Sequence, residues 1–260
     1  MNSANIALIL LQIAVLIATL FGSIRAIGTS DHSIPLIFFA FAMTSVLLSD
    51  FYWLAYMFLR PETRMPFAAN EIAEWAMFLL LGTSLTTGLP GLFCAARRET
   101  LFAALFSAAN AALWGAWSGE WVQDIMTGAA LGYLLCCLAS RLKGSGSLST
   151  PEWGTLGGAC VVLIAAESSV LLVPESFKQP VDLLCYALLF AVAAFLILLA
   201  ALTMRKGGDP DRGVGLSFAA FAWCIITMYL STGTLYFVAF LLVTLCFQMM
   251  FLSLRKEAAS

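Results

Sequence analysis

Two acidic residues, Asp50 and Glu167, lie within long apolar segments of the sequence. An ionised carboxylate inside a bilayer costs at least about 2.5–3.5 kcal/mol, so it is expected to face the protein interior with a partner or a proton. Both acids fall in the C-terminal halves of their expected helices, where the helix dipole does not stabilise a negative charge. They are therefore the first candidates for cation binding, proton transfer or acid–base catalysis.

Two further pairs of acids are spaced for one helix face. Glu71 and Glu74 are three residues apart, and Glu120 and Asp124 are four apart, so each pair lies on one side of its helix. Glu71 and Glu120 also have a structural explanation, since free N–H groups stabilise acids in a first turn. Glu74 and Asp124 lie one turn deeper, and we expect Asn110 at a similar depth.

Aromatic residues gather near these acids. Tyr52 and Trp53 follow Asp50, and three tryptophans, Trp114, Trp117 and Trp121, surround the segment that contains Glu120. An interfacial aromatic belt explains such residues structurally, whereas an acidic aromatic cavity would bind an organic ammonium by cation–π attraction. Both interpretations stay open. The candidate substrate-binding residues are Asp50, Glu74, Asp124, Glu167, Asn110, Trp114, Trp117, Trp121, Glu71, Glu120, Tyr52 and Trp53.

Several kinds of chemistry lack the residues that they require. The single histidine, His32, falls in an expected loop, which leaves no material for a haem, a histidine zinc site or Ser–His catalysis. No expected span carries a lysine for retinal, and no nucleotide-binding glycine motif occurs. The net charge of −2 argues against nucleic acid as a partner. Any catalytic residue, metal or cofactor stays unknown, and the expected partners are membrane lipids and a small cationic solute or a lipid.

The composition identifies the elements that must hold these residues. Hydrophobic residues make up 62% of the 260 residues and charged residues 11%, as in an integral membrane protein. A span needs about 20 apolar residues, and nine segments qualify. We predict an all-α polytopic membrane bundle, a single transmembrane domain over 1–260, with spans near 5–27, 34–59, 69–90, 99–118, 120–142, 154–173, 180–204, 213–231 and 234–254.

Two apolar stretches, 99–142 and 213–254, are about twice as long as a membrane is thick when built as one helix. Each must therefore fold back on itself. Ser118-Gly119 and Ser231-Thr232-Gly233 supply turn-forming residues near the two midpoints.

The basic residues predict the orientation. With nine spans, ten of the 13 Lys and Arg residues fall on one side, and only Arg60, Arg64 and Lys178 fall on the other. Short cytoplasmic loops carry the excess of positive charge, so the N-terminus is expected outside and the C-terminus in the cytoplasm. The deep acids then lie toward the outside of a plasma membrane or bacterial inner membrane.

Three functions fit this pattern. The leading hypothesis is a small transporter or permease with an outward-facing acidic, aromatic-rich cavity for a cationic or amine-bearing solute, with protons as a conceivable coupling ion. The first alternative is an intramembrane hydrolase or transferase that acts on a lipid through paired carboxylates, with or without a divalent metal. The second is a membrane sensor or receptor-like subunit. The oligomeric state is undetermined.

Overall fold

The computed structural model describes residues 3–29, 34–59, 69–87, 96–146, 148–172, 174–205 and 209–259. Over these residues the chain forms nine α-helices and no strand. The helices are α1 (Ser3–Ile27), α2 (Ile34–Leu59), α3 (Ala69–Thr86), α5 (Arg97–Ser118), α6 (Trp121–Gly144), α7 (Thr150–Leu172), α8 (Glu175–Arg205), α9 (Pro210–Leu230) and α10 (Gly233–Ala258). A helix occupies each of the nine segments for which one is expected.

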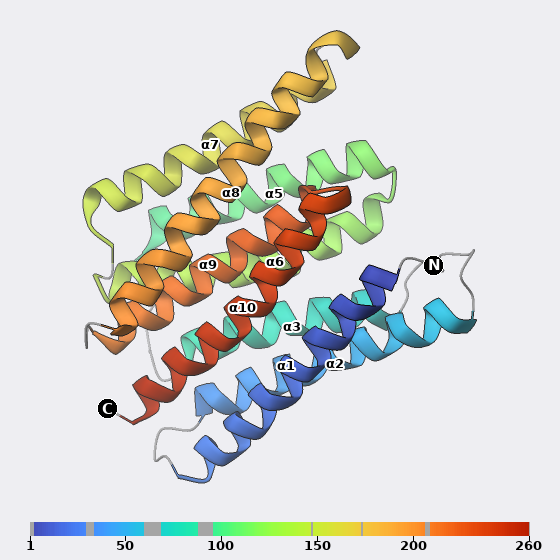
Figure 1. The fold of residues 1–260 in the computed structure, drawn as a ribbon. Helices are drawn as coiled ribbons and strands as arrows, with labels where there is room; N and C mark the ends of the chain where they lie inside the picture. Colours follow the sequence, from blue (N-terminus) through green and yellow to red (C-terminus); the bar gives the residue numbers. More distant parts are fainter. Residues whose placement is uncertain are drawn as a thin grey trace.

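The structure confirms a polytopic helical membrane bundle. Within the described residues, seven helices are long and apolar enough to cross a bilayer, namely α1, α2, α5, α6, α8, α9 and α10. The remaining two, α3 and α7, run alongside these seven in the same bundle (Figure 1). That α3 and α7 also span the membrane, and which face of the bundle is cytoplasmic, stay predictions.

Both expected hairpin turns are present. α5 ends at Ser118, and Gly119 takes a left-handed conformation (φ 74°) while its N–H bonds the Gly115 carbonyl at 3.0 Å. Gly233 (φ 58°) similarly begins α10 after the extended residues Ser231 and Thr232. A residue with a Cβ is strained at positive φ, which explains why glycine allows the chain to reverse at these points.

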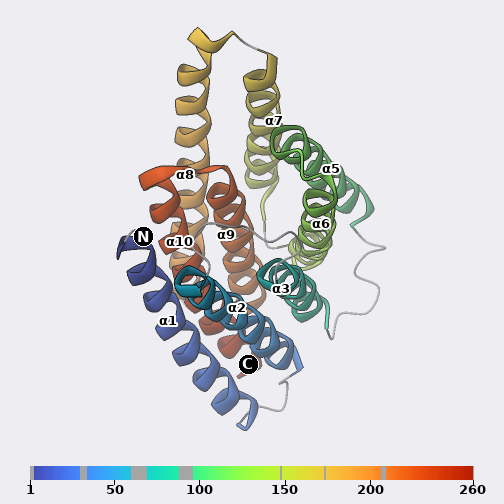
Figure 2. The ribbon, with the colours of Figure 1, turned by 90° about the vertical axis from the view of Figure 1, so that its right-hand side faces the viewer.

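Helix α9 is the central element of the bundle. Every residue from Gly213 to Thr227 is buried, and α9 packs against α10, α8 and α6. Figure 2 shows α9 near the middle of the bundle, with α5 and α6 on one side and α1 and α10 on the other. A helix that is apolar on all faces is buried on all faces, in agreement with the composition of α9.

Ion pairs collect at one end of the bundle, where α6 and α10 finish and α9 begins. Arg141, only 2% exposed, binds Asp211 at 2.6 Å, Glu257, and the Leu85 carbonyl at 3.0 Å. Lys143 also pairs with Glu99 at 3.0 Å. This cation-rich end is the one for which the charge distribution predicts the cytoplasm.

Candidate functional site

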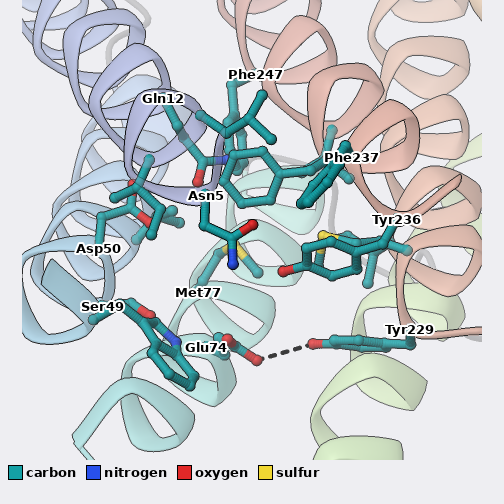
Figure 3. A pocket seen from close by; sticks show the side chains of 18 of the residues that line it. Asn5, Gln12, Ser49, Asp50, Glu74, Met77, Tyr229, Tyr236, Phe237 and Phe247 are labelled. Atoms are coloured by element: carbon teal, nitrogen blue, oxygen red, sulfur yellow. Dashed lines mark hydrogen bonds between the residues drawn. The ribbon is translucent and has the colours of Figure 1, made fainter. Parts of the chain in front are cut away.

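A cavity of about 240 Å³ lies between α1, α2, α3, α9 and α10, toward the end of the bundle opposite the Arg141 ion pairs. It begins near Asn5 in the first turns of α1 and near Tyr236 in the first turn of α10 (Figure 3). Its polar lining residues are Asn5, Gln12, Ser49, Asp50, Glu74, Tyr229 and Tyr236, and its aromatic ones include Trp53, Phe237, Phe240 and Phe247. Polar groups thus converge in an otherwise apolar chamber, the usual form of a small-molecule site.

Asp50 is the most deeply placed acid of this cavity, at 6% exposed. The Gln12 amide lies between Asp50 and Thr244. With its nitrogen toward Asp50 it donates to both carboxylate oxygens, at 3.1 and 3.2 Å, and its oxygen accepts from the Thr244 hydroxyl at 3.2 Å. The reverse orientation sets the amide oxygen against the carboxylate and lets the amide nitrogen donate to the Thr244 hydroxyl at 3.2 Å, so the first orientation is the one that an ionised Asp50 requires. One neutral amide therefore holds the carboxylate in position.

Glu74 reaches the same cavity from α3. Its carboxylate accepts a hydrogen bond from the Tyr229 hydroxyl at 3.0 Å, which joins α3 to α9 (Figure 3). The neighbouring Trp75 points the other way, toward α6, and its indole N–H donates to Thr127 at 2.9 Å. This bond fixes the rotation of α3 that turns Glu74 toward the cavity.

Trp114 contributes to the site indirectly. Its ring packs edge-on against the Tyr229 ring, with centroids 5.6 Å apart, and the residue is 8% exposed. It does not line the cavity, but it supports the tyrosine that bonds Glu74. Of the candidate aromatic residues, only Trp53 lines the cavity directly.

The charge of the lining is one-sided. Asp50 and Glu74 are its ionisable acids, and no described lining residue is Lys, Arg or His. Among the described residues, no group of three or more His, Cys, Asp or Glu could hold a metal ion. The described lining thus places two carboxylates beside aromatic rings, groups that attract a positive charge through the carboxylates and through cation–π contact.

The other acids of the α5–α6 turn lie elsewhere. Asp124 accepts a hydrogen bond from the Ser118 hydroxyl at 2.5 Å, and the same hydroxyl accepts from the Glu120 N–H at 2.8 Å. Trp117 and Trp121 are 44% and 49% exposed beside this turn. The densest polar and aromatic segment of the sequence is thus a hairpin turn that contributes no lining residue to the cavity.

Three of the remaining candidates are buried without lining the cavity. Asn110, 1% exposed, donates to the Phe106 carbonyl at 2.9 Å within α5, and Glu71 is 5% exposed in the first turn of α3. Glu167 on α7 is 2% exposed, and neither of its carboxylate oxygens has a hydrogen-bond partner among the described residues. Tyr52 stacks on Tyr56 with centroids 6.1 Å apart. Of the candidates from sequence, Asp50, Glu74 and Trp53 line this cavity, and the other nine do not.

Several lining residues were not among the candidates from sequence. Four of them have uncharged polar side chains, namely Gln12, Asn5, Tyr229 and Tyr236. A search of the sequence for charged residues within the membrane does not find them. A polar signal existed for Gln12, an amide in the otherwise apolar middle of α1. The tyrosines carried no comparable signal, because tyrosine is also common at membrane interfaces.

No protein-family model, curated protein or solved structure matches this chain. The functional argument therefore starts from the cavity and its lining residues.

Proposed function

We propose that the protein is a small transporter of the cell membrane that binds a cationic, amine-bearing solute in the cavity between α1, α2, α3, α9 and α10. The observation that carries this proposal is the position of Asp50. Its carboxylate is buried beside a chamber that Glu74 also lines. None of the described lining residues has a cationic side chain.

The lining matches an ammonium group with an apolar substituent. The cavity is lined by three amphipathic aromatic residues, Trp53, Tyr229 and Tyr236, together with the two acids. An aromatic ring attracts a desolvated cation by about 2 kcal/mol or more. Phe237 and Phe247 add apolar surface on the α10 side of the cavity (Figure 3). A chamber of about 240 Å³ is smaller than the sites of drug-sized ligands, which indicates a small solute.

The two ends of the bundle support transport over simple binding. The cavity lies toward one end, while Arg141 ties α3, α6, α9 and α10 together at the other. A site reached from one side and closed on the other is what alternating access requires of one of its two states. Protonation of the same carboxylates in the absence of solute would supply the coupling ion.

Ligand binding to the purified protein tests the first part of the proposal. We expect thermal stabilisation by some members of a panel of primary, quaternary and polyamine cations, about 2.7 kcal/mol at 100 times the Kd. Asp50→Asn and Glu74→Gln should each weaken binding at least about tenfold, the equivalent of 1.4 kcal/mol. Asp124→Asn is the matched control, since Asp124 is an acid outside the cavity, and it should bind normally.

Uptake into reconstituted vesicles tests the second part. The stabilising amine should accumulate, faster with an imposed pH gradient, and Asp50→Asn should abolish accumulation. Binding without uptake would favour a sensor, and lipid turnover by the purified protein would favour the intramembrane enzyme. Unchanged uptake of every candidate cation after simultaneous neutralisation of Asp50 and Glu74 would overturn the proposal.

A further inference from the structure

A second cavity, of about 320 Å³, lies between the α5–α6 hairpin and the α7–α8 hairpin, with α9 at its base. Among the described residues, none lines both this cavity and the first. Its walls are almost wholly apolar and include Phe102, Leu138, Leu156, Cys160 and Trp223. An apolar crevice of this kind has no group that would hold a polar solute in its interior.

Small residues create the space. Larger side chains would fill the crevice at five of its lining positions, which are Ala103, Ala139, Gly157, Ala219 and Ala222. A Cβ atom at Gly157 would meet no heavy atom within 4 Å, so the helix surface there faces open space.

The indole nitrogen of Trp223, a lining residue on α9, is bonded to the backbone of α8. The indole N–H donates to the Leu189 carbonyl at 2.9 Å, so the ring presents only apolar surface to the crevice. The interior thus offers van der Waals contact and no unsatisfied hydrogen-bonding group from this residue.

The mouth of the crevice has the opposite character. Arg98 and Glu99 line it at the cation-rich end of the bundle, and Trp153 lies beside them in the first turn of α7. Glu99 is paired with Lys143 at 3.0 Å. No described residue forms a salt bridge or hydrogen bond with the exposed Arg98 guanidinium, whose charge acts on the carboxylate of the adjacent Glu99.

We propose that this crevice binds one acyl chain of an anionic phospholipid from the leaflet at the cation-rich end, with the lipid phosphate on Arg98. The chain fits the apolar interior, and the planar guanidinium is suited to a phosphate that it can bind with two parallel hydrogen bonds. Basic pockets between membrane helices are known to take anionic head groups in this way. The site is separate from the amine cavity and does not depend on the transport proposal.

Native mass spectrometry of the purified protein with defined lipids tests this site. We expect phosphatidylglycerol to bind at least about tenfold more tightly than phosphatidylcholine with the same acyl chains. Arg98→Gln should remove this preference, while Arg97→Gln, which changes an exposed neighbouring arginine that does not line the crevice, should keep it.

A second pair of variants tests the chain-binding part. Gly157→Leu places a side chain in the open crevice and should lower the affinity for both lipids at least about tenfold. Gly158→Leu makes the same change at the adjacent exposed position, outside the crevice, and should bind both lipids normally. Both changes raise helix propensity alike, so folding does not distinguish them.

Equal affinity of the wild type for the two lipids, or equal effects of Arg98→Gln and Arg97→Gln, would overturn the selection of an anionic lipid by Arg98, since both lipids carry a phosphate and only phosphatidylglycerol has a net negative charge. Unchanged lipid affinity in Gly157→Leu would overturn the crevice as the chain site. Unchanged amine binding in all four variants is expected, which separates this site from the transport cavity.

Discussion

The Tyr229 hydroxyl donates a hydrogen bond to the Glu74 carboxylate at 3.0 Å and thereby joins α9, the central helix, to α3. Trp114 supports this tyrosine from α5 through an edge-on ring contact. The wall of the cavity beside Asp50 is therefore coupled to the packing of three helices, and a ligand that draws Glu74 toward itself would move groups on all three.

Tyr229→Phe removes this hydrogen bond and keeps the ring. We expect a loss of about 1 kcal/mol in the free energy of unfolding. The average hydrogen bond between membrane helices contributes somewhat less than this to stability, and a hydrogen bond to a charged group contributes somewhat more. Thermal unfolding of Tyr229→Phe, Glu74→Gln and the double variant measures the coupling. Strictly additive effects of the two changes would show that the bond contributes nothing.

Arg141→Met removes the buried cation that holds Asp211, Glu257 and the Leu85 carbonyl. Without Arg141 the two acids lose their partner, but their side chains are 41% and 26% exposed and remain partly solvated. We therefore expect a destabilisation of about 3 kcal/mol, at the lower end of the cost of breaking a buried ion pair. Lys143→Met is the control, because its partly exposed pair with Glu99 should contribute less than about 1 kcal/mol. Similar melting temperatures for the two variants would contradict this assignment.

Glu167→Met replaces a buried carboxyl group that has no hydrogen-bond partner among the described residues. Burial of an unsatisfied polar group costs about 1–3 kcal/mol, so we expect the variant to be more stable by a comparable amount. Glu167→Gln separates the effect of charge from that of size. A fall in the melting temperature of both variants would instead mean that the carboxyl group makes a stabilising contact.

Gly128→Ala adds one carbon at a tight contact between α6 and α5. A Cβ at this position would overlap the Cβ of Ala111, and the Gly128 carbonyl accepts from the Ser107 hydroxyl at 2.6 Å. We expect a loss of about 1–3 kcal/mol from overpacking, measured by thermal unfolding. Gly158→Ala, which faces open space, should be neutral or slightly stabilising through helix propensity.

Cysteine labelling tests the predicted orientation. A membrane-impermeant thiol reagent should label Glu120→Cys on intact cells and Lys143→Cys only after permeabilisation. Both positions are exposed, and they lie at opposite ends of α6. The unaltered chain supplies the background from its own cysteines. The reverse labelling pattern would place the cavity beside Asp50 toward the cytoplasm.

The sequence by itself determined the nine helical segments, because apolar length and turn residues such as Gly119 and Gly233 are local properties. It also indicated Asp50, since an acid in a long apolar segment is conspicuous wherever the helices pack. It also predicted that the basic residues gather at one end. Successive loops lie on alternate sides of the membrane, so this prediction needs no knowledge of which helices contact one another.

Only the tertiary structure decided which acids share a cavity. Glu74 and Asp124 have the same sequence pattern, yet Trp75 and Tyr229 fix Glu74 toward Asp50 while Ser118 holds Asp124 at the hairpin turn. Gln12, the amide that binds Asp50, is uncharged and costs little to insert, so charge alone did not reveal it. The rotation of each helix about its axis depends on contacts between segments far apart in the chain, and these contacts, not the local spacing of residues, assembled the site.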